Sequence, residues 1–172
     1  MPSKFVLVII TSVFTLASRE GLQIKSEALL NTVLRGVDSI HHEVIDLSDS
    51  TQNHIHALTG TFFDDRFVDL FSVYQSDSIA GFGLMDSVRS KSSFLPFLVI
   101  VDKKGAIQSV ELLSTPDLRS AKLRSPLWKK QFIGKKEIKS RQIDALSGAT
   151  ISSNDITHGV IRLLLYLRLS EN

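Results

Sequence analysis

The segment Asp144–Thr150 reads Asp-Ala-Leu-Ser-Gly-Ala-Thr and stands directly before an apolar stretch at the end of the chain. The apolar residues of that stretch are Ile156, Val160, Leu163, Leu164 and Leu167. Their spacing predicts a C-terminal helix with one buried face. Ser152 and Asp155 have the spacing of a capping box, with Asp in place of the usual Glu, and indicate where this helix begins. We therefore expect residues 147–150 to form a tight turn at a helix N-terminus.

A turn in this position is favourable for an anion. The free backbone N–H groups and the dipole of the following helix both attract a phosphate group. Gly148 and Ala149 let the backbone approach such a group closely, and Thr150 adds a hydroxyl beside it. Turns of the same composition also serve only to cap a helix. The residues by themselves leave both interpretations open.

Together with Ile151-Ser152-Ser153 and the terminal helix, this segment resembles the signature of the FMN-binding domain family. The family includes the C subunit of the sodium-translocating NADH:quinone oxidoreductase and the G subunit of the Rnf electron-transport complex. In it, the last Thr of Ser-Gly-Ala-Thr carries FMN through a phosphoester bond, which a separate flavin transferase forms by consuming FAD. The resemblance implies that Thr150 is the acceptor. The other residues of the turn that it places in the flavin site are Ser147, Gly148 and Ala149, with Asp144 shaping the turn or engaging the transferase.

Two further segments carry the same resemblance. Phe94–Ile107 resembles the strand-turn-strand that precedes the flavin loop, and Ser125–Lys135 resembles the family's "W..QF.GK" segment. The resemblance thus covers roughly residues 81–169, and the first half of the chain contributes little to it.

The loop between these segments departs from the family pattern. Where better-known members have Glu-Thr-Pro-Gly against the flavin, this chain has Ser114-Thr115-Pro116-Asp117, which keeps only the Thr-Pro pair. By the resemblance, Thr115 and Leu118 are candidates to line the isoalloxazine ring. Ordinary packing within a loop is the alternative for both residues.

Composition excludes several classes of protein. The chain has 172 residues, 43% of them hydrophobic, and a formal net charge of +2, which indicates one folded domain and no nucleic-acid partner. It has no cysteine, which excludes disulfides, iron–sulfur clusters, thiolate metal sites, covalent c-type haem and a lipoprotein anchor.

Residues 1–17 are typical of a targeting segment. Lys4 gives a positive start, Phe5–Ala17 is almost wholly apolar, and Thr15-Leu16-Ala17 resembles a cleavage site. The apolar run is short for a transmembrane helix, which needs about 20 residues. We expect a cleaved signal peptide, with a retained short anchor as the second choice and a buried N-terminal element as the alternative. Residues 18–172 would then form a single FMN-binding domain in the periplasm or at the outer face of the cytoplasmic membrane.

The middle of the chain predicts an antiparallel sheet. Four strands are expected from period-two patterning, at Phe67–Gln75, Ile79–Val88, Phe94–Asp102 and Ala106–Leu113. Short turns join them into a meander, and the turn at residues 102–105 has a Gly that can take positive φ. Helices at both ends of the chain are expected to cover one face of this sheet, which is an α+β fold.

The first half contributes a predicted helix at Ser26–Val37, a loop at Asp46–Asn53, and a short helix that opens at His54–Leu58 and closes at Gly60. Four histidines, at positions 41, 42, 54 and 56, match no metal-binding spacing. We therefore expect no metal site.

The segment from Arg119 to Arg141 contains nine basic residues and one acidic residue, Glu137. A solvated basic face is the simplest interpretation. The alternatives are that some of these charges attract the phosphates of FAD or FMN, or an acidic docking surface. Trp128 and Phe132, four residues apart, are expected to form a pair in the core.

These observations favour an electron carrier over a complete enzyme. The sequence has no dinucleotide fingerprint, and a Thr hydroxyl needs an activating partner that no residue near Thr150 supplies. We therefore expect a flavin transferase to modify Thr150, and a membrane redox protein or quinone reductase to be the partner of the flavoprotein. The alternatives are a noncovalent FMN-binding module or flavin-dependent reductase, and a non-redox interaction domain.

Overall fold

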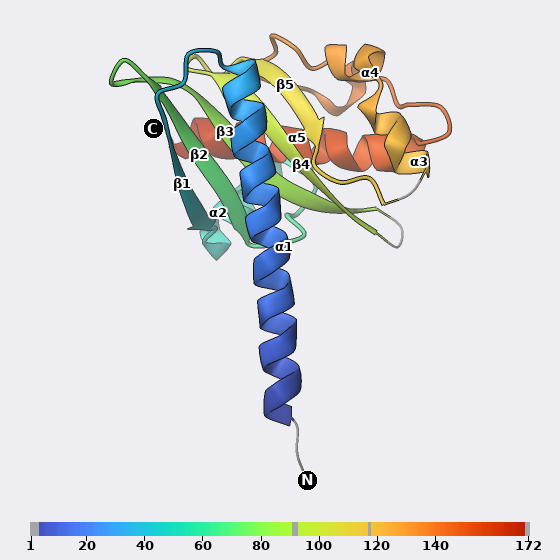
Figure 1. The fold of residues 1–172 in the computed structure, drawn as a ribbon. Coiled ribbons are helices and arrows are strands. Elements are labelled where there is room, and N and C mark those ends of the chain that lie inside the picture. Colours follow the sequence, from blue (N-terminus) through green and yellow to red (C-terminus); the bar gives the residue numbers. More distant parts are fainter. Residues whose placement is uncertain (1–3, 91–92, 117, 171–172) are drawn as a thin grey trace.

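A five-stranded antiparallel sheet forms the centre of the computed structural model, which describes residues 4–90, 93–116 and 118–170. The strands follow one another in the order β1-β2-β3-β4-β5, as a meander (Figure 1). The elements are α1 (Lys4–Val33), β1 (Ser39–Asp46), α2 (Asp49–Thr59), β2 (Phe67–Gln75), β3 (Ser78–Ser90), β4 (Ser93–Asp102), β5 (Ile107–Leu112), α3 (Leu118–Ala121), η1 (Lys122–Arg124), α4 (Pro126–Lys130), η2 (Ser140–Gln142) and α5 (Thr150–Ser170). The expected α+β fold is confirmed.

The four predicted strands are β2 to β5, and the structure adds β1 at the edge of the sheet. β1 pairs with β2 from Ser39 opposite Tyr74 to Asp46 opposite Phe67. The sequence analysis missed this strand because an edge strand keeps many polar side chains exposed, so no apolar alternation marks it. The predicted turn between β4 and β5 is confirmed, with Gly105 at φ +76°.

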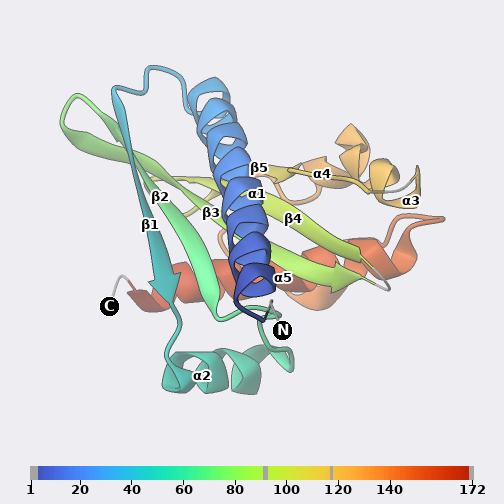
Figure 2. The ribbon, with the colours of Figure 1, turned by 60° about the horizontal axis from the view of Figure 1, so that its bottom comes forward.

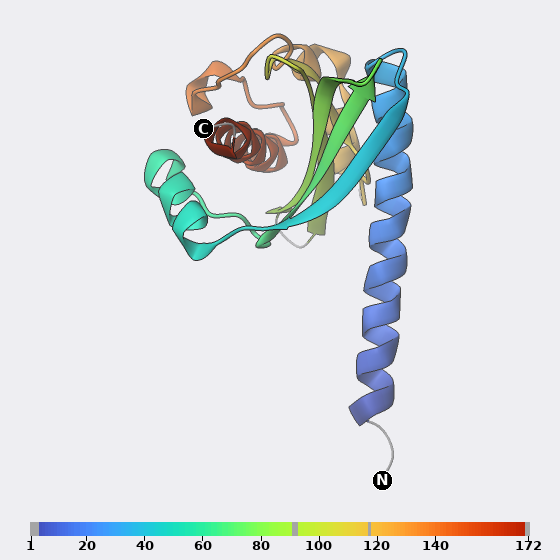
Figure 3. The same cartoon turned by 90° about the vertical axis from the view of Figure 1, so that its left-hand side faces the viewer.

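The two terminal helices cover opposite faces of the sheet, so the expectation that they share one face is wrong. Figure 3 shows the sheet between α1 on one side and α5 on the other. On the α1 face Leu30 packs with Phe71 and Leu98, whereas on the α5 face Phe97 packs with Val160. The reason lies in β4, where residues 97–101 are all fully buried. A continuous apolar run of this kind is typical of a strand that is covered on both faces.

Helix α1 is longer than the helix predicted at residues 26–37, because it runs without interruption from Lys4 to Val33. The C-terminal part of α1 lies along the sheet, and its N-terminal part extends beyond it (Figures 1 and 3). Arg19 forms an ion pair with Asp69 of β2, at 2.8 Å. Residues 1–3 of the predicted targeting segment lie outside the described residues. Among the residues that the structure describes, no helix is long and apolar enough to cross a membrane.

Helix α2 begins five residues before His54, so the second part of the loop expected at residues 46–53 is helical. Ser48 caps it by accepting a hydrogen bond from the backbone N–H of Thr51, at 3.2 Å. At the other end Gly60 adopts φ +72° and closes the helix as predicted. His56 stacks on Phe62, and the four histidines join no cluster of three metal-ligating residues in the described part of the chain.

The segment after α4 is fixed against both the sheet and α5. Trp128 and Phe132 form the predicted core pair, with ring centroids 5.1 Å apart in an edge-to-face arrangement. Gly134 donates its N–H to the carbonyl of Ile107 at 2.8 Å, and Ile107 donates to the carbonyl of Lys135 at 2.9 Å. These bonds extend the sheet edge at β5, and residues 136–139 that follow line one cavity together with α5.

Candidate functional site

The turn predicted at residues 147–150 is present, but its last residue already belongs to α5, which begins at Thr150. The capping box expected at Ser152 and Asp155 is wrong, because both residues lie inside the helix. The Ser152 hydroxyl instead forms a hydrogen bond with the Ser90 hydroxyl of β3, at 2.8 Å. The first intrahelical acceptor is the carbonyl of Ala149, which bonds the N–H of Ser153 at 2.9 Å.

The buried side chain of Ser153 holds the turn that precedes α5 through two hydrogen bonds. Its buried hydroxyl accepts a hydrogen bond from the N–H of Leu146 and donates one to the carbonyl of Thr150, both at 3.0 Å. Ala149 is buried in the core of the α5 face, and Gly148 adopts φ +78°, a conformation that favours glycine. The turn is therefore held by the core on one side while its other side faces solvent.

The exposed side of the turn offers unused hydrogen-bond donors. Ser147, Gly148 and Thr150 are all exposed. The backbone N–H groups of Thr150, Ile151 and Ser152 have no acceptor among the residues that the structure describes. These groups belong to the first turn of a 21-residue helix, where the helix dipole makes an anion favourable.

A cation lies against the same turn. A Cβ atom placed on Gly148 would clash with Nζ of Lys122, so the ammonium group rests on the glycine itself. Lys122 is exposed and begins η1, and the fully buried Leu123 anchors that element in the core. Lys122 has no acidic partner in the described part of the chain, whereas Lys129 of the same basic stretch is paired with Glu111 at 2.8 Å. Sequence reasoning counted Lys122 among nine basic residues and had no signal to select it.

The remaining candidates lie at the same end of the molecule. Asp144 is exposed, and its backbone N–H donates to the side-chain oxygen of Gln131, at 2.8 Å. Thr115 is half-buried between β5 and α3, and Leu118 of α3 is 89% exposed. Figures 1 and 2 both place α3 beside the turn that precedes α5. Lys122 is the residue of this loop region that reaches the turn, and Asp117 lies outside the described residues.

Residues 91–165 match the family model of the FMN-binding domain. This part of the chain is similar to an FMN-binding domain. The matched part includes β4, β5, Thr115, Lys122, the turn and most of α5. A search of curated proteins found no match to the chain.

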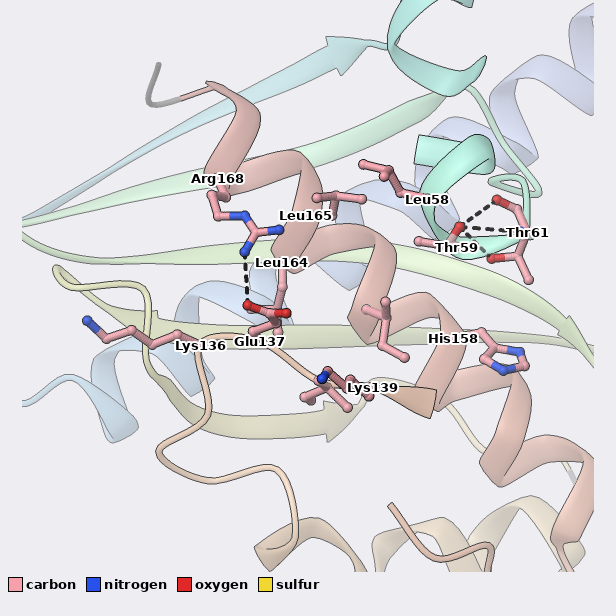
Figure 4. A pocket seen from close by; sticks show the side chains of 12 residues that line it. Leu58, Thr59, Thr61, Lys136, Glu137, Lys139, His158, Leu164, Leu165 and Arg168 are labelled. Carbon is pink, nitrogen blue, oxygen red and sulfur yellow. Dashed lines mark hydrogen bonds and ion pairs between the residues drawn. The ribbon is translucent and has the colours of Figure 1, made fainter. Parts of the chain in front are cut away.

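The residues of the turn fit a phosphate group such as that of FMN. The first turn of α5 has N–H groups without an acceptor among the described residues, Gly148 has no side chain, and the Lys122 ammonium group lies against that glycine. Among the described residues, the Thr150 hydroxyl has no hydrogen-bond partner. The nearest histidine along α5 is His158, eight residues after Thr150, and its side chain lines a different pocket (Figure 4).

The chain also contains a buried ionisable pair that no sequence pattern marks. Asp86 of β3 and Arg162 of α5 are both buried, and Arg162 contacts the segment that follows α2. Burial raises the pKa of Asp86 to about 7, and the charge of Arg162 partly opposes this shift. Burial likewise lowers the pKa of the Arg162 guanidinium, against the attraction of Asp86.

Both members of this pair are incompletely hydrogen-bonded. Asp86 accepts a bond from the N–H of Ser87 at 2.7 Å through one oxygen, and its other oxygen has no partner among the described residues. Arg162 donates through Nη1 to the Thr61 hydroxyl at 3.3 Å and lies 5.2 Å from the ring of Phe63, while Nε and Nη2 have no partner there. No sequence pattern connects these residues, because two different elements contribute them.

Proposed function

We propose that this protein carries FMN on Thr150 through a phosphoester bond and acts as an electron carrier. The observation that supports this most directly is the exposed Thr150 hydroxyl at the first residue of α5, with the ammonium group of Lys122 against the same turn. In this proposal Lys122 and the N–H groups of Ile151 and Ser152 hold the phosphate, and Ser147 lies beside it. The FMN-binding domain match supports flavin as the group that is held.

Attachment requires a second protein in this proposal. The Thr150 oxygen forms a bond to the flavin-side phosphorus of FAD, the bond between the two phosphates breaks, and AMP leaves. The hydroxyl proton passes to a base of the flavin transferase, because the described part of this chain has no base beside Thr150. Once bound, FMN supplies one- or two-electron transfer, and the protein sets its position and surroundings.

The location and partners that we propose are extracytoplasmic. The apolar sequence of residues 5–17, which forms the first part of α1, supports a chain that is exported, or anchored by a short segment at the outer face of the membrane. A membrane redox protein or quinone reductase is the proposed electron-transfer partner. The absence of a dinucleotide fingerprint from the sequence supports a carrier that depends on such a partner.

Noncovalent FMN binding is the second candidate. It is favoured by the same ammonium group, because a cation and three free N–H groups can hold a phosphate without any bond to Thr150.

The test is the intact mass of denatured protein that was exported from cells expressing a flavin transferase. We expect an added mass equal to FMN less one water, on the peptide that contains Thr150. Thr150→Ala should remove this mass, and the control Thr32→Ala, on the exposed side of α1, should keep it. Yellow colour that is lost on unfolding, with no added mass, would favour noncovalent binding. A flavinylated Thr150→Ala protein would refute the assignment of the acceptor.

A further inference from the structure

A cavity lies where α2 ends, away from the turn at residues 147–149 that precedes α5. It has a volume of about 390 Å³ and is formed by three separate segments: the end of α2 with residues 59–61, residues 136–139, and the face of α5 from His158 to Arg168 (Figure 4). This volume lies within the range of about 300–1,000 Å³ that is usual for small-molecule sites.

The walls of this cavity are held by the fold. Residues 136–139 follow the hydrogen bonds that join Gly134 and Lys135 to β5, and Ile138 is buried in the core. The end of α2 is fixed by the left-handed Gly60, and the Thr59 hydroxyl donates to the carbonyl of Ile55 at 2.8 Å. The cavity is therefore formed before any ligand arrives.

The inner surface of the cavity is apolar. Leu164 and Leu165 of α5 are buried there, and Ile161 lies one helical turn before them. Leu58 stands at the end of α2 with 61% of its surface exposed, although it is a large apolar side chain. An apolar ligand body would cover this side chain, and burying it is favourable by about 25 cal/mol per Å² of area.

The rim of the cavity is positively charged. Three basic residues, Lys136, Lys139 and Arg168, and one acidic residue, Glu137, line it, which gives a formal charge of +2 with His158 neutral. Glu137 is paired with Arg168 at 3.2 Å. Lys136 and Lys139 are exposed and have no acidic partner in the described part of the chain, so their ammonium groups remain available to a ligand.

We propose that this cavity binds a small organic anion with an apolar body, such as an aromatic or aliphatic carboxylate. The apolar body packs against Leu58, Ile161 and Leu165, and the charged group is held by Lys136 and Lys139. The site is separate from the flavin turn, because His158 lies eight residues, or about 12 Å along the helix axis, from Thr150. The proposal does not depend on the flavin.

The test is a titration of the full chain with 2-naphthoate, followed by amide chemical shifts. The neutral counterpart 2-naphthylmethanol, which has nearly the same shape, reports the contribution of charge. We expect 2-naphthoate to shift amides of residues 58–61, 136–139 and 158–168, and the alcohol to bind about tenfold more weakly, a difference of about 1.4 kcal/mol. Thr150→Ala should bind 2-naphthoate as the unchanged chain does.

Two variants decide the location. Lys136→Glu combined with Lys139→Glu should weaken 2-naphthoate binding by about tenfold or more, since two attractive charges become repulsive. The matched control, Lys103→Glu with Lys104→Glu in the β4–β5 turn, carries the same charge change and should bind normally. Any of four results would overturn the proposal. The acid and the alcohol could bind with equal affinity, or the Lys136 and Lys139 double variant could bind 2-naphthoate as the unchanged chain does. The shifts could centre on residues 146–153, or no shift could occur at about millimolar ligand.

Discussion

Replacing Asp86 by Asn should make the domain more stable at neutral and alkaline pH. Asp86 is only 5% exposed, and burial raises its pKa from 3.8 to about 7. An acid with a raised pKa in the folded state binds more protons when folded than when unfolded. The free energy of unfolding therefore falls as the pH rises from about 4 to about 7, and it stays at the lower value above that range.

The size of this effect follows from the difference between the two pKa values. The pKa rises by about 3.2 units, from 3.8 to about 7, and each unit corresponds to 1.36 kcal/mol, so the loss is about 4 kcal/mol. This value already includes the attraction of Arg162, which opposes the shift. Asn has nearly the same shape as Asp and carries no charge. The difference in unfolding free energy between Asp86→Asn and the unchanged protein should therefore grow by about 4 kcal/mol between about pH 4 and pH 8.

Urea unfolding curves at several pH values measure this difference, because the other titrating groups are common to both proteins. Asp77→Asn is the control, since Asp77 is exposed in the β2–β3 turn and adopts φ +58°, where Asn is well tolerated. Parallel stability curves for Asp86→Asn and the unchanged protein would refute the reasoning. A variant that is less stable at pH 8 would show that the attraction of Arg162 exceeds the cost of burying the carboxylate.

Three further predictions concern the turn and the core. Lys122→Glu should weaken FMN binding or flavinylation by at least about tenfold, whereas Lys104→Glu should not; equal flavin occupancy of the two variants would contradict a role for Lys122. Gly148→Ala and Gly105→Ala should each lower the free energy of unfolding by about 1–2 kcal/mol, because both glycines have positive φ. Flavin occupancy should fall only for Gly148→Ala, which displaces Lys122, and an equal fall for both would rule out that explanation. Leu163→Asp should abolish cooperative unfolding in circular dichroism, because it places an unpaired charge at a fully buried position; a cooperative melt would show that α5 is not docked as described.

Most of the sheet could be predicted from the sequence because its turns are marked. Ser76 and Asp77 at the β2–β3 turn and Gly105 at the β4–β5 turn all adopt positive φ, and residues of these types are common in such turns. β1 could not be predicted in the same way, because His41, His42 and Glu43 interrupt any apolar alternation. The start of α5 was misplaced because Ser152 has the spacing of a cap, while the hydroxyl that organises the turn belongs to Ser153.

The candidate site was predictable only as far as it is continuous in the sequence. Residues 144–150 form one motif, and the structure shows them as a turn with free N–H groups. Lys122 reaches that turn from η1, and its position depends on the burial of Leu123. Asp86 lies on β3 and Arg162 on α5, and their charges interact only because the folded chain packs α5 against the sheet.

The Ser153 hydroxyl has a consequence for how the turn opens. Because it bonds both Leu146 and Thr150 from a fully buried position, the turn cannot leave the core while the first turn of α5 stays folded. The amide hydrogens of Leu146 and Ser153 should then exchange with solvent at similar rates, set by the opening of the first turn of α5. A short peptide of this segment would lack that restraint, so only a folded protein presents the Thr150 hydroxyl in this shape.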